Sequence, residues 1–177
     1  MTFNVPLMHN PDAHNGGKNP VVVIGLGNPL MSDDGVGLVL WELVQKARDW
    51  GNDVIFEDGG TSGMSMLPLV EDALTVIFLD GTRTGGMPGD LIIRRDDELP
   101  AYFSHVLSPH QIGLREVLGA AQLRGFMPEK LSLIGIEIES VAFACGLTPA
   151  VEQALPQAVS LAVAEIESAL TLISHDA

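Results

Sequence analysis

The sequence contains a single cysteine, Cys145, among its 177 residues. One cysteine excludes a disulfide within the chain and is typical of proteins from a reducing compartment. Basic residues are also scarce, because 9 Lys and Arg stand against 23 Asp and Glu, which gives a formal net charge of −14. That charge would repel phosphate backbones, so nucleic acid is not expected as a partner.

Long apolar runs and export signals are missing as well. No uninterrupted apolar run approaches the roughly 20 residues that span a bilayer, so no membrane span is predicted. The first twenty residues have neither the basic n-region nor the apolar h-region of a secretory signal, and we expect a cytoplasmic protein. Their Asn, Gly and Pro content predicts a flexible leader over residues 1–19, followed by a single α/β domain over residues 20–174.

The remaining sequence alternates apolar and amphipathic segments. Four consecutive β-branched residues beginning at Val21 predict a strand buried on both faces, as in a parallel sheet. Further strands are predicted at 53–56, 74–79, 91–95 and 131–138, and helices at about 33–48, 64–71, 109–123 and from 149 onward. The connection before 91–95 is too short for a crossover helix, which predicts an antiparallel edge strand. The fold class is therefore α/β, a three-layer α/β/α domain with a mostly parallel five-stranded sheet.

Three side chains with ligand chemistry occupy comparable places in this fold. Asp34 follows the first strand, Asp80 ends the third, and His110 begins a helix in the segment SPHQ. Because the carboxyl ends of neighbouring parallel strands meet at one edge of a sheet, these residues can meet in space. Two carboxylates and an imidazole suit a borderline divalent ion such as nickel or zinc. His105, in the segment YFSH, is a weaker candidate.

Each of these residues also has a purely structural interpretation. Asp33 and Asp34 both favour a helix N-terminus, and Asp33 is the better cap while Asp34 is the better ligand. The segment DGT that begins at Asp80 can close a strand as an Asx-type turn. Asp58 is expected to organise the glycine-rich turn DGGTSG. Cys145 is predicted to be a small buried residue, because nothing near it in the sequence would activate its thiol.

Two familiar motifs do not fit the chain. GLGNPL is not a dinucleotide-binding fingerprint, because Leu30 stands where a third glycine or alanine belongs. IGLGNP resembles the opening of peptidyl-tRNA hydrolases, but the Gly, Tyr and His-Asn pair that follow in that family are missing from MSDDGVG. Hydrolysis of peptidyl-tRNA is therefore a minor alternative, which the net negative charge also disfavours.

Several motifs together resemble the nickel-iron hydrogenase maturation endopeptidases. They are GLGNPLMSDDGVG, EDGGTSGM, the strand that ends in Asp80, LSPHQIGL and GLTPAVE, and they extend in the same order from about Val21 to Ser168. The resemblance implies an endopeptidase that removes the C-terminal extension of a nickel-loaded hydrogenase large-subunit precursor. It implies that the metal-contacting and catalytic residues are Asp34, Asp80 and His110. It also implies a substrate-guiding segment, which consists of Asp58, Gly59, Gly60 and Thr61.

The metal implied by this resemblance is nickel supplied by the substrate, for which cadmium or zinc could substitute in a crystal. A bound divalent ion can polarise a peptide carbonyl and activate water. Alternatively, nickel serves only for recognition while Asp34 or Asp80 acts as general base. A non-enzymatic nickel-binding chaperone of the same α/β shape is the alternative function.

Overall fold

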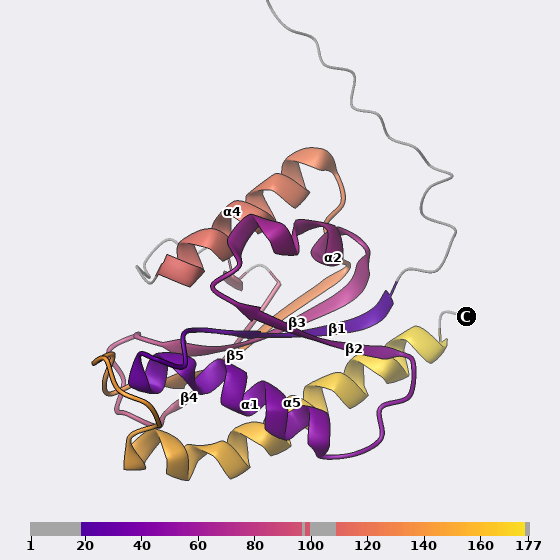
Figure 1. The fold of residues 1–177 in the computed structure, drawn as a ribbon. Coiled ribbons are helices and arrows are strands. Elements are labelled where there is room, and N and C mark those ends of the chain that lie inside the picture. Colours follow the sequence, from indigo (N-terminus) through magenta and orange to yellow (C-terminus); the bar gives the residue numbers. More distant parts are fainter. Residues whose placement is uncertain (1–18, 97, 100–108, 176–177) are drawn as a thin grey trace, which may run out of the picture.

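The structure, a computed structural model, describes residues 19–96, 98–99 and 109–175. A five-stranded sheet in the order β2-β1-β3-β5-β4 forms its middle layer (Figure 1). The strands are β1 (Asn19–Leu26), β2 (Val54–Gly60), β3 (Ala73–Thr82), β4 (Leu91–Arg95) and β5 (Lys130–Glu137). β1 is parallel to β2 and β3, β3 is parallel to β5, and β4 is antiparallel to β5 at the edge. The predicted mostly parallel sheet with one antiparallel edge strand is confirmed.

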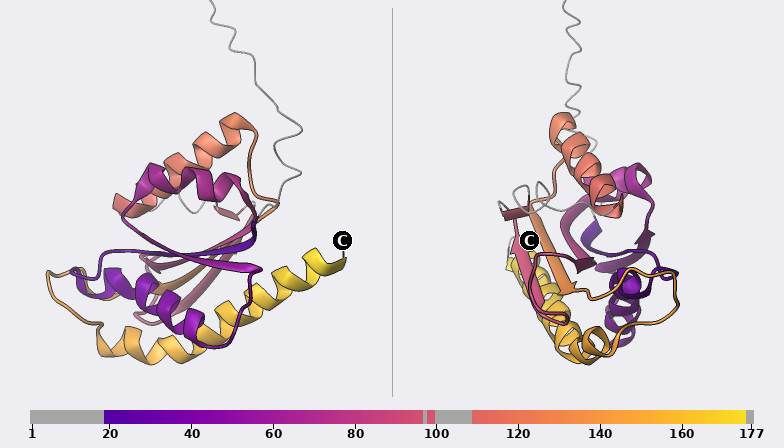
Figure 2. Two further views of the ribbon diagram at one scale, coloured as in Figure 1. Left: turned by 45° about the vertical axis from the view of Figure 1, so that its right-hand side comes forward. Right: turned by 90° about the vertical axis from the view of Figure 1, so that its left-hand side faces the viewer.

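Helices cover both faces of the sheet. α1 (Val36–Lys46) and α5 (Pro149–His175) lie on one face, and α2 (Leu67–Glu71) and α4 (Pro109–Arg124) lie on the other (Figure 2). Short 3-10 helices, η1 (Ser32–Gly35) and η2 (Gly63–Met66), lead into α1 and α2. Both α4 and α5 begin with a proline, whose fixed φ and missing N–H suit the first helical turn.

β1 is buried on both faces, as its run of β-branched residues predicts. Val21 and Val23 join the core formed with α1 and α5, whereas Val22 and Ile24 join the core formed with α2 and α4. All four side chains are fully buried. Since successive strand residues point to opposite faces, an uninterrupted apolar run is what a central strand requires. Each such side chain contributes roughly 1.5–3 kcal/mol through its burial.

Two strands are longer at their carboxyl ends than the sequence predicts. β3 continues past Asp80 to Thr82, because its ladder with β5 continues to Glu137. β2 continues to Gly60, which pairs with Leu26 of β1. The predictions that Asp80 ends its strand and that residues 58–60 form a turn were therefore wrong. Ladder partners in the neighbouring strands overrode the local turn preference of aspartate and glycine.

α5 is long and apolar enough to cross a membrane by length and composition, over Pro149–Ile173, and it is the one helix among the described residues that passes this test. A core helix passes the same test. The stripe that α5 presents to the sheet is buried, and it consists of Val151, Leu155, Ala158, Ala162, Ile166 and Ala169. This stripe packs in the core, while 22% of the apolar window as a whole is buried.

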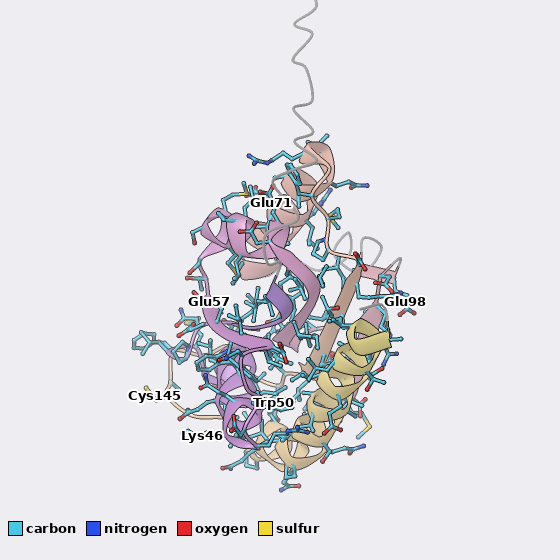
Figure 3. All side chains as sticks on the ribbon, turned by 90° about the vertical axis from the view of Figure 1, so that its right-hand side faces the viewer. Lys46, Trp50, Glu57, Glu71, Glu98 and Cys145 are labelled. Atoms are coloured by element: carbon cyan, nitrogen blue, oxygen red, sulfur yellow. The ribbon has the colours of Figure 1, made fainter. Side chains whose placement is uncertain are left out.

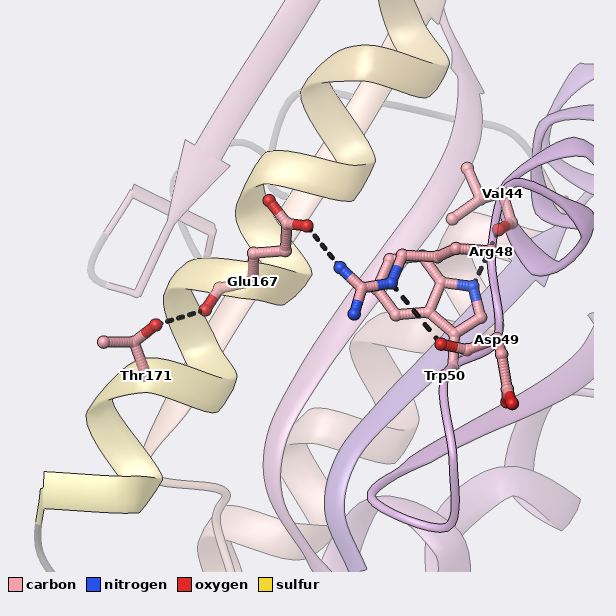
Figure 4. Close-up of polar contacts among 6 residues, drawn as sticks. All are labelled: Val44, Arg48, Asp49, Trp50, Glu167 and Thr171. Carbon is pink, nitrogen blue, oxygen red and sulfur yellow. Dashed lines mark hydrogen bonds and ion pairs between the residues drawn. The ribbon is translucent and has the colours of Figure 1, made fainter.

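The carboxyl end of α1 is tied to α5 through Arg48. The guanidinium of Arg48 forms an ion pair with Glu167 and lies 5.0 Å from the centroid of the Trp50 ring (Figure 4). Trp50 in turn donates a hydrogen bond of 2.9 Å from Nε1 to the carbonyl of Val44. Half-exposed ion pairs contribute only about 0–1 kcal/mol, so the position of α1 depends on its apolar core contacts more than on this ion pair.

Candidate functional site

The turn between β1 and α1 holds Asp34 in a defined position. Gly27 has a φ of +119°, and a Cβ atom there would lie 1.8 Å from the carbonyl oxygen of Asp34. Only glycine permits so close an approach of the chain to itself. The main-chain N–H of Asn28 donates a hydrogen bond of 3.0 Å to Oδ2 of Asp34. The Asp34 side chain is half-buried, so its carboxylate is oriented by the turn and still partly open to solvent.

Asp80 lies on β3, the strand next to β1, and is fully buried. Gly37 in the first turn of α1 brings the helix onto the ends of both strands. A Cβ atom at Gly37 would lie 2.3 Å from the carbonyl oxygens of Leu26 and Leu79 and 2.9 Å from Cα of Asp80. The helix that begins two residues after Asp34 therefore rests directly on Asp80. Two of the three predicted ligands come from the same edge of the sheet, as the parallel arrangement of β1 and β3 predicts.

His110 belongs to the first turn of α4, and the side chains of residues 109–112 lie outside the described set. The position of the helix is fixed by Gly113, where a Cβ atom would lie 3.0 Å from Cα of Gly63. α4 thus begins beside the start of η2, on the side of the molecule where α1 and α5 also begin (Figure 1). His105 lies outside the described residues.

No group of three or more His, Cys, Asp or Glu side chains is arranged to hold a metal ion within the part of the chain that the structure describes. That part does not include the imidazole of His110, so the grouping of Asp34, Asp80 and His110 stays a prediction. In the predicted substrate-guiding segment, Asp58 and Thr61 are exposed. Gly59 is buried, and a Cβ atom there would lie 2.6 Å from a methyl carbon of Ile24.

Asp33 is not the helix cap that the sequence predicts. Neither η1 nor α1 has a side-chain cap, and Asp33 is fully buried. Its Oδ2 accepts hydrogen bonds from the main-chain N–H groups of Glu139 and Ser140, both at 3.0 Å, and from the hydroxyl of Thr148 at 2.9 Å. Its Oδ1 accepts one from the N–H of Thr148 at 2.6 Å. Asp33 therefore fixes the loop 138–148 between β5 and α5, and its partners lie too far along the chain for local sequence to indicate them.

The β5–α5 loop also pairs with the turn that carries Asp34. Met31 and Ala144 form a parallel bridge. The N–H of Ser32 donates to the carbonyl of Ala144 at 2.8 Å, and the N–H of Ala144 donates to the carbonyl of Leu30 at 3.1 Å. Cys145 follows in this loop and lies at the periphery of the molecule (Figure 3). The prediction that Cys145 is buried was wrong, because main-chain hydrogen bonds join these loops and leave the side chains outside.

A further buried carboxylate, Glu137, was missed by the sequence analysis. It accepts hydrogen bonds from the N–H and hydroxyl of Thr84 and from the N–H of Gly85, at 2.8–2.9 Å. These contacts fix the start of the segment between β3 and β4. An acidic residue at the end of a buried strand is the one sequence signal that could have indicated this role. Asp33 and Glu137 together hold the loops that follow β5 and β3.

Among the described groups, shifted pKa values are resolved for Glu165 on α5 and Arg95 at the end of β4. Nη2 of Arg95 lies 2.6 Å from Oε2 of Glu165, and the hydroxyl of Ser132 donates to Oε1 at 2.6 Å. The hydrogen bond from Arg95 holds the pKa of Glu165 below its usual value, and the same bond raises the pKa of Arg95. Ser132 pairs with Arg95 near the amino end of β5, so this cluster stabilises the fold away from Asp34 and Asp80.

Comparisons with known proteins agree on one family. Residues 38–165 match the family model described as hydrogenase maturation protease. The hydrogenase 2 maturation protease of Escherichia coli K12 is 35% identical over 159 residues, which cover 89% of this chain and 97% of the relative. The hydrogenase expression/formation protein HupD of Rhodobacter capsulatus is 35% identical over 84% of this chain and 71% of its own length. The solved structure of the hydrogenase maturating endopeptidase HybD from Escherichia coli superposes with a TM-score of 0.80, at 35% identity, and the match covers 84% of this chain and 92% of that one.

Proposed function

The chain belongs to the hydrogenase maturation protease family and is an endopeptidase, and we propose that it removes the C-terminal extension of a hydrogenase large subunit after nickel insertion. Family membership implies the large-subunit precursor as substrate and sets aside the metal-chaperone and peptidyl-tRNA hydrolase alternatives. The finer proposal is that nickel carried by the precursor marks it as ready for cleavage. The reaction would take place in the cytoplasm, in keeping with a chain that has a single, unpaired cysteine.

The observation that carries this proposal is the contact of α1 with Asp80 through Gly37. It brings the residue that follows β1, Asp34, and a residue of the adjacent β3 to one edge of the sheet. The start of α4, with His110, lies on the same side of the molecule (Figure 1). Oxygen and imidazole donors together suit a nickel ion better than they suit calcium or copper(I). The residue types at this edge of the sheet therefore support the proposal of a substrate-borne nickel ion.

The proposed chemistry is hydrolysis of one peptide bond. Water adds to the scissile carbonyl carbon, the C–N bond breaks, and the departing amine takes a proton. A divalent ion near the bond would polarise the carbonyl and lower the pKa of bound water. If the ion serves for recognition alone, Asp34 is the better candidate for the general base, because its carboxylate is half-buried and partly open to solvent.

The burial of Asp80 sets a condition on this mechanism. Its carboxylate is fully buried, so an ion on the substrate can reach it only after neighbouring groups shift. Docking of the precursor would have to drive that shift. A precursor without nickel would gain nothing from the two carboxylates and the imidazole, and it would be processed slowly. This requirement makes metal loading a condition for cleavage.

The test is incubation of the purified chain with nickel-loaded and nickel-free precursor, followed by mass spectrometry of the large subunit. Loss of a C-terminal fragment is expected only from the nickel-loaded form. Asp34→Asn, Asp80→Asn and His110→Ala should each reduce the cleavage rate by at least about a hundredfold, as expected for groups that act in the transition state. Asp53→Asn is the matched control, because Asp53 is exposed and precedes β2. Equal cleavage of both precursor forms, or normal cleavage by all three variants, would contradict the proposal.

A further inference from the structure

Two large apolar side chains stand exposed on the paired loops beside Asp34. Leu30 is 51% exposed and Phe143 is 83% exposed. Met31 and Ala144 form the bridge between the two loops; Leu30 precedes Met31 in one loop, and Phe143 precedes Ala144 in the other. We call Leu30 and Phe143 the apolar platform. Exposed apolar side chains gathered at one place on a surface commonly mark a site of protein interaction.

The platform is held rigidly by the main chain beneath it. The N–H of Ala144 donates to the carbonyl of Leu30, and the four hydrogen bonds accepted by Asp33 fix both ends of the β5–α5 loop. A side chain on a mobile loop loses conformational freedom when it binds, which weakens affinity. Phe143 is carried on a loop that is already ordered, so this cost is low. Large aromatic side chains are among the residues that dominate binding energy in protein interfaces.

The platform is also continuous with the candidate catalytic edge. Leu30 lies in the turn in which the N–H of Asn28 bonds to the carboxylate of Asp34. Exposed carboxylates lie nearby, on Glu139 of the β5–α5 loop and on Asp58 near the carboxyl end of β2. The whole chain carries a formal charge of −14. An occupant with an apolar centre and neutral or basic flanks would complement these features, whereas an acidic segment would be repelled.

We propose that the apolar platform docks a segment of the hydrogenase large-subunit precursor, whose apolar side chain packs between Leu30 and Phe143 and whose flanks are neutral or basic. This inference rests on the proposed function, because a protease of this family must hold its protein substrate close to the residues that act on it. Docking here would place the adjoining peptide next to Asp34.

The first test compares Phe143→Ala and Leu30→Ala with Leu123→Ala. Leu123 is 82% exposed in the last turn of α4 and serves as a matched control. Phe143→Ala should raise KM for the nickel-loaded precursor by about tenfold or more, which corresponds to about 1.4 kcal/mol of binding free energy. The single-turnover rate at saturating precursor should stay unchanged, and all three variants should melt within a few degrees of wild type. An unchanged KM in both platform variants would overturn the inference.

Cys145 provides a second measurement that does not depend on cleavage. It is the only cysteine in the sequence, is exposed, and lies two residues after Phe143. Bound precursor should slow its modification by a maleimide several-fold, measured by mass spectrometry of this chain. At a precursor concentration near the wild-type KM, Phe143→Ala should remove most of that protection. Unprotected Cys145 in a mixture where the precursor is being cleaved contradicts the platform but not the function. Protection without any cleavage contradicts the function but not the platform.

Association between copies of this chain is the other occupant to test. Sedimentation velocity of the protein alone should give the same oligomeric state for wild type and Phe143→Ala. If the substitution dissociates a wild-type dimer, the platform is a contact between copies, and the inference is wrong.

Discussion

Replacing Asp33 should destabilise the protein far more than replacing Asp34 beside it. Asp33 is fully buried and accepts four hydrogen bonds, three of them from main-chain N–H groups. Asp34 is half-buried, and among its contacts is a main-chain hydrogen bond from Asn28. The two residues are identical in chemistry and adjacent in sequence. The difference between the two stability losses therefore measures how much more the contacts of Asp33 contribute than those of Asp34.

The magnitude follows from the contacts. A hydrogen bond to a charged group contributes about 1.5–3 kcal/mol, and donors left without an acceptor add to the loss. The donors that face Asp33 are partly open to water, which can replace some of the lost bonds, so Asp33→Ala should cost about 3–5 kcal/mol. Asp34→Ala should cost about 1 kcal/mol. Asp33→Asn should lie between them, because one oxygen still accepts while the amide nitrogen faces N–H donors.

Urea denaturation followed by circular dichroism would measure both effects. With a slope of about 2 kcal/mol per molar urea, the midpoint should fall by about 2 M for Asp33→Ala and by about 0.5 M for Asp34→Ala. The precursor assay should rank the variants differently, since Asp34→Ala should remain folded and inactive. Equal midpoint shifts for the two alanine variants would refute the assignment of Asp33 as the residue that fixes the β5–α5 loop.

Two further predictions concern the packing of α1 and the charge cluster on α5. Gly37→Ala should lower the melting temperature by several degrees or more and reduce precursor cleavage, because its Cβ would lie 2.3 Å from two carbonyl oxygens and 2.9 Å from Cα of Asp80. Gly119→Ala, which has open space around it inside α4, is the control and should leave cleavage unchanged. It should raise the melting temperature slightly, because alanine is more favourable than glycine in a helix interior by about 1 kcal/mol. The pKa of the Glu165 carboxyl is lower in the folded protein than its usual value of 4.5. The ionised side chain therefore stabilises the fold at pH values above 4.5, and this contribution is lost as the pH falls through the lower folded pKa. The unfolding free energies of wild type and Glu165→Gln can be measured with urea at a series of pH values. They should differ most near neutral pH and converge below pH 4.5. A constant difference across that range would show that the ion pair with Arg95 does not cause the difference in stability.

The features that the sequence predicts correctly are those set by local patterns. The β-branched run from Val21 to Ile24 identified the central strand, since only a strand buried on both faces tolerates four such residues in succession. The short connection before Leu91 identified the antiparallel edge strand, because a parallel partner needs a longer crossover. Pro109 and Pro149 marked two helix starts.

The features that the sequence could not indicate depend on partners far along the chain. Asp33 was expected to cap a helix, but its hydrogen-bond donors lie 106 to 115 residues away. β3 was expected to end at Asp80, but its neighbour β5 offers ladder partners for two more residues. Cys145 was expected inside the core, yet it follows a bridge made by main-chain atoms. In each case a tertiary contact overrode the local preference on which the prediction was based.

The most direct measurement for the central claim is a crystal structure of the protein grown with zinc or cadmium, with anomalous scattering used to locate the ion. We expect one peak shared by carboxylate oxygens of Asp34 and Asp80 and an imidazole nitrogen of His110, with bonds of about 2.0–2.2 Å for zinc. A peak that contacts other residues only, or an imidazole of His110 directed away from both carboxylates, would contradict the account.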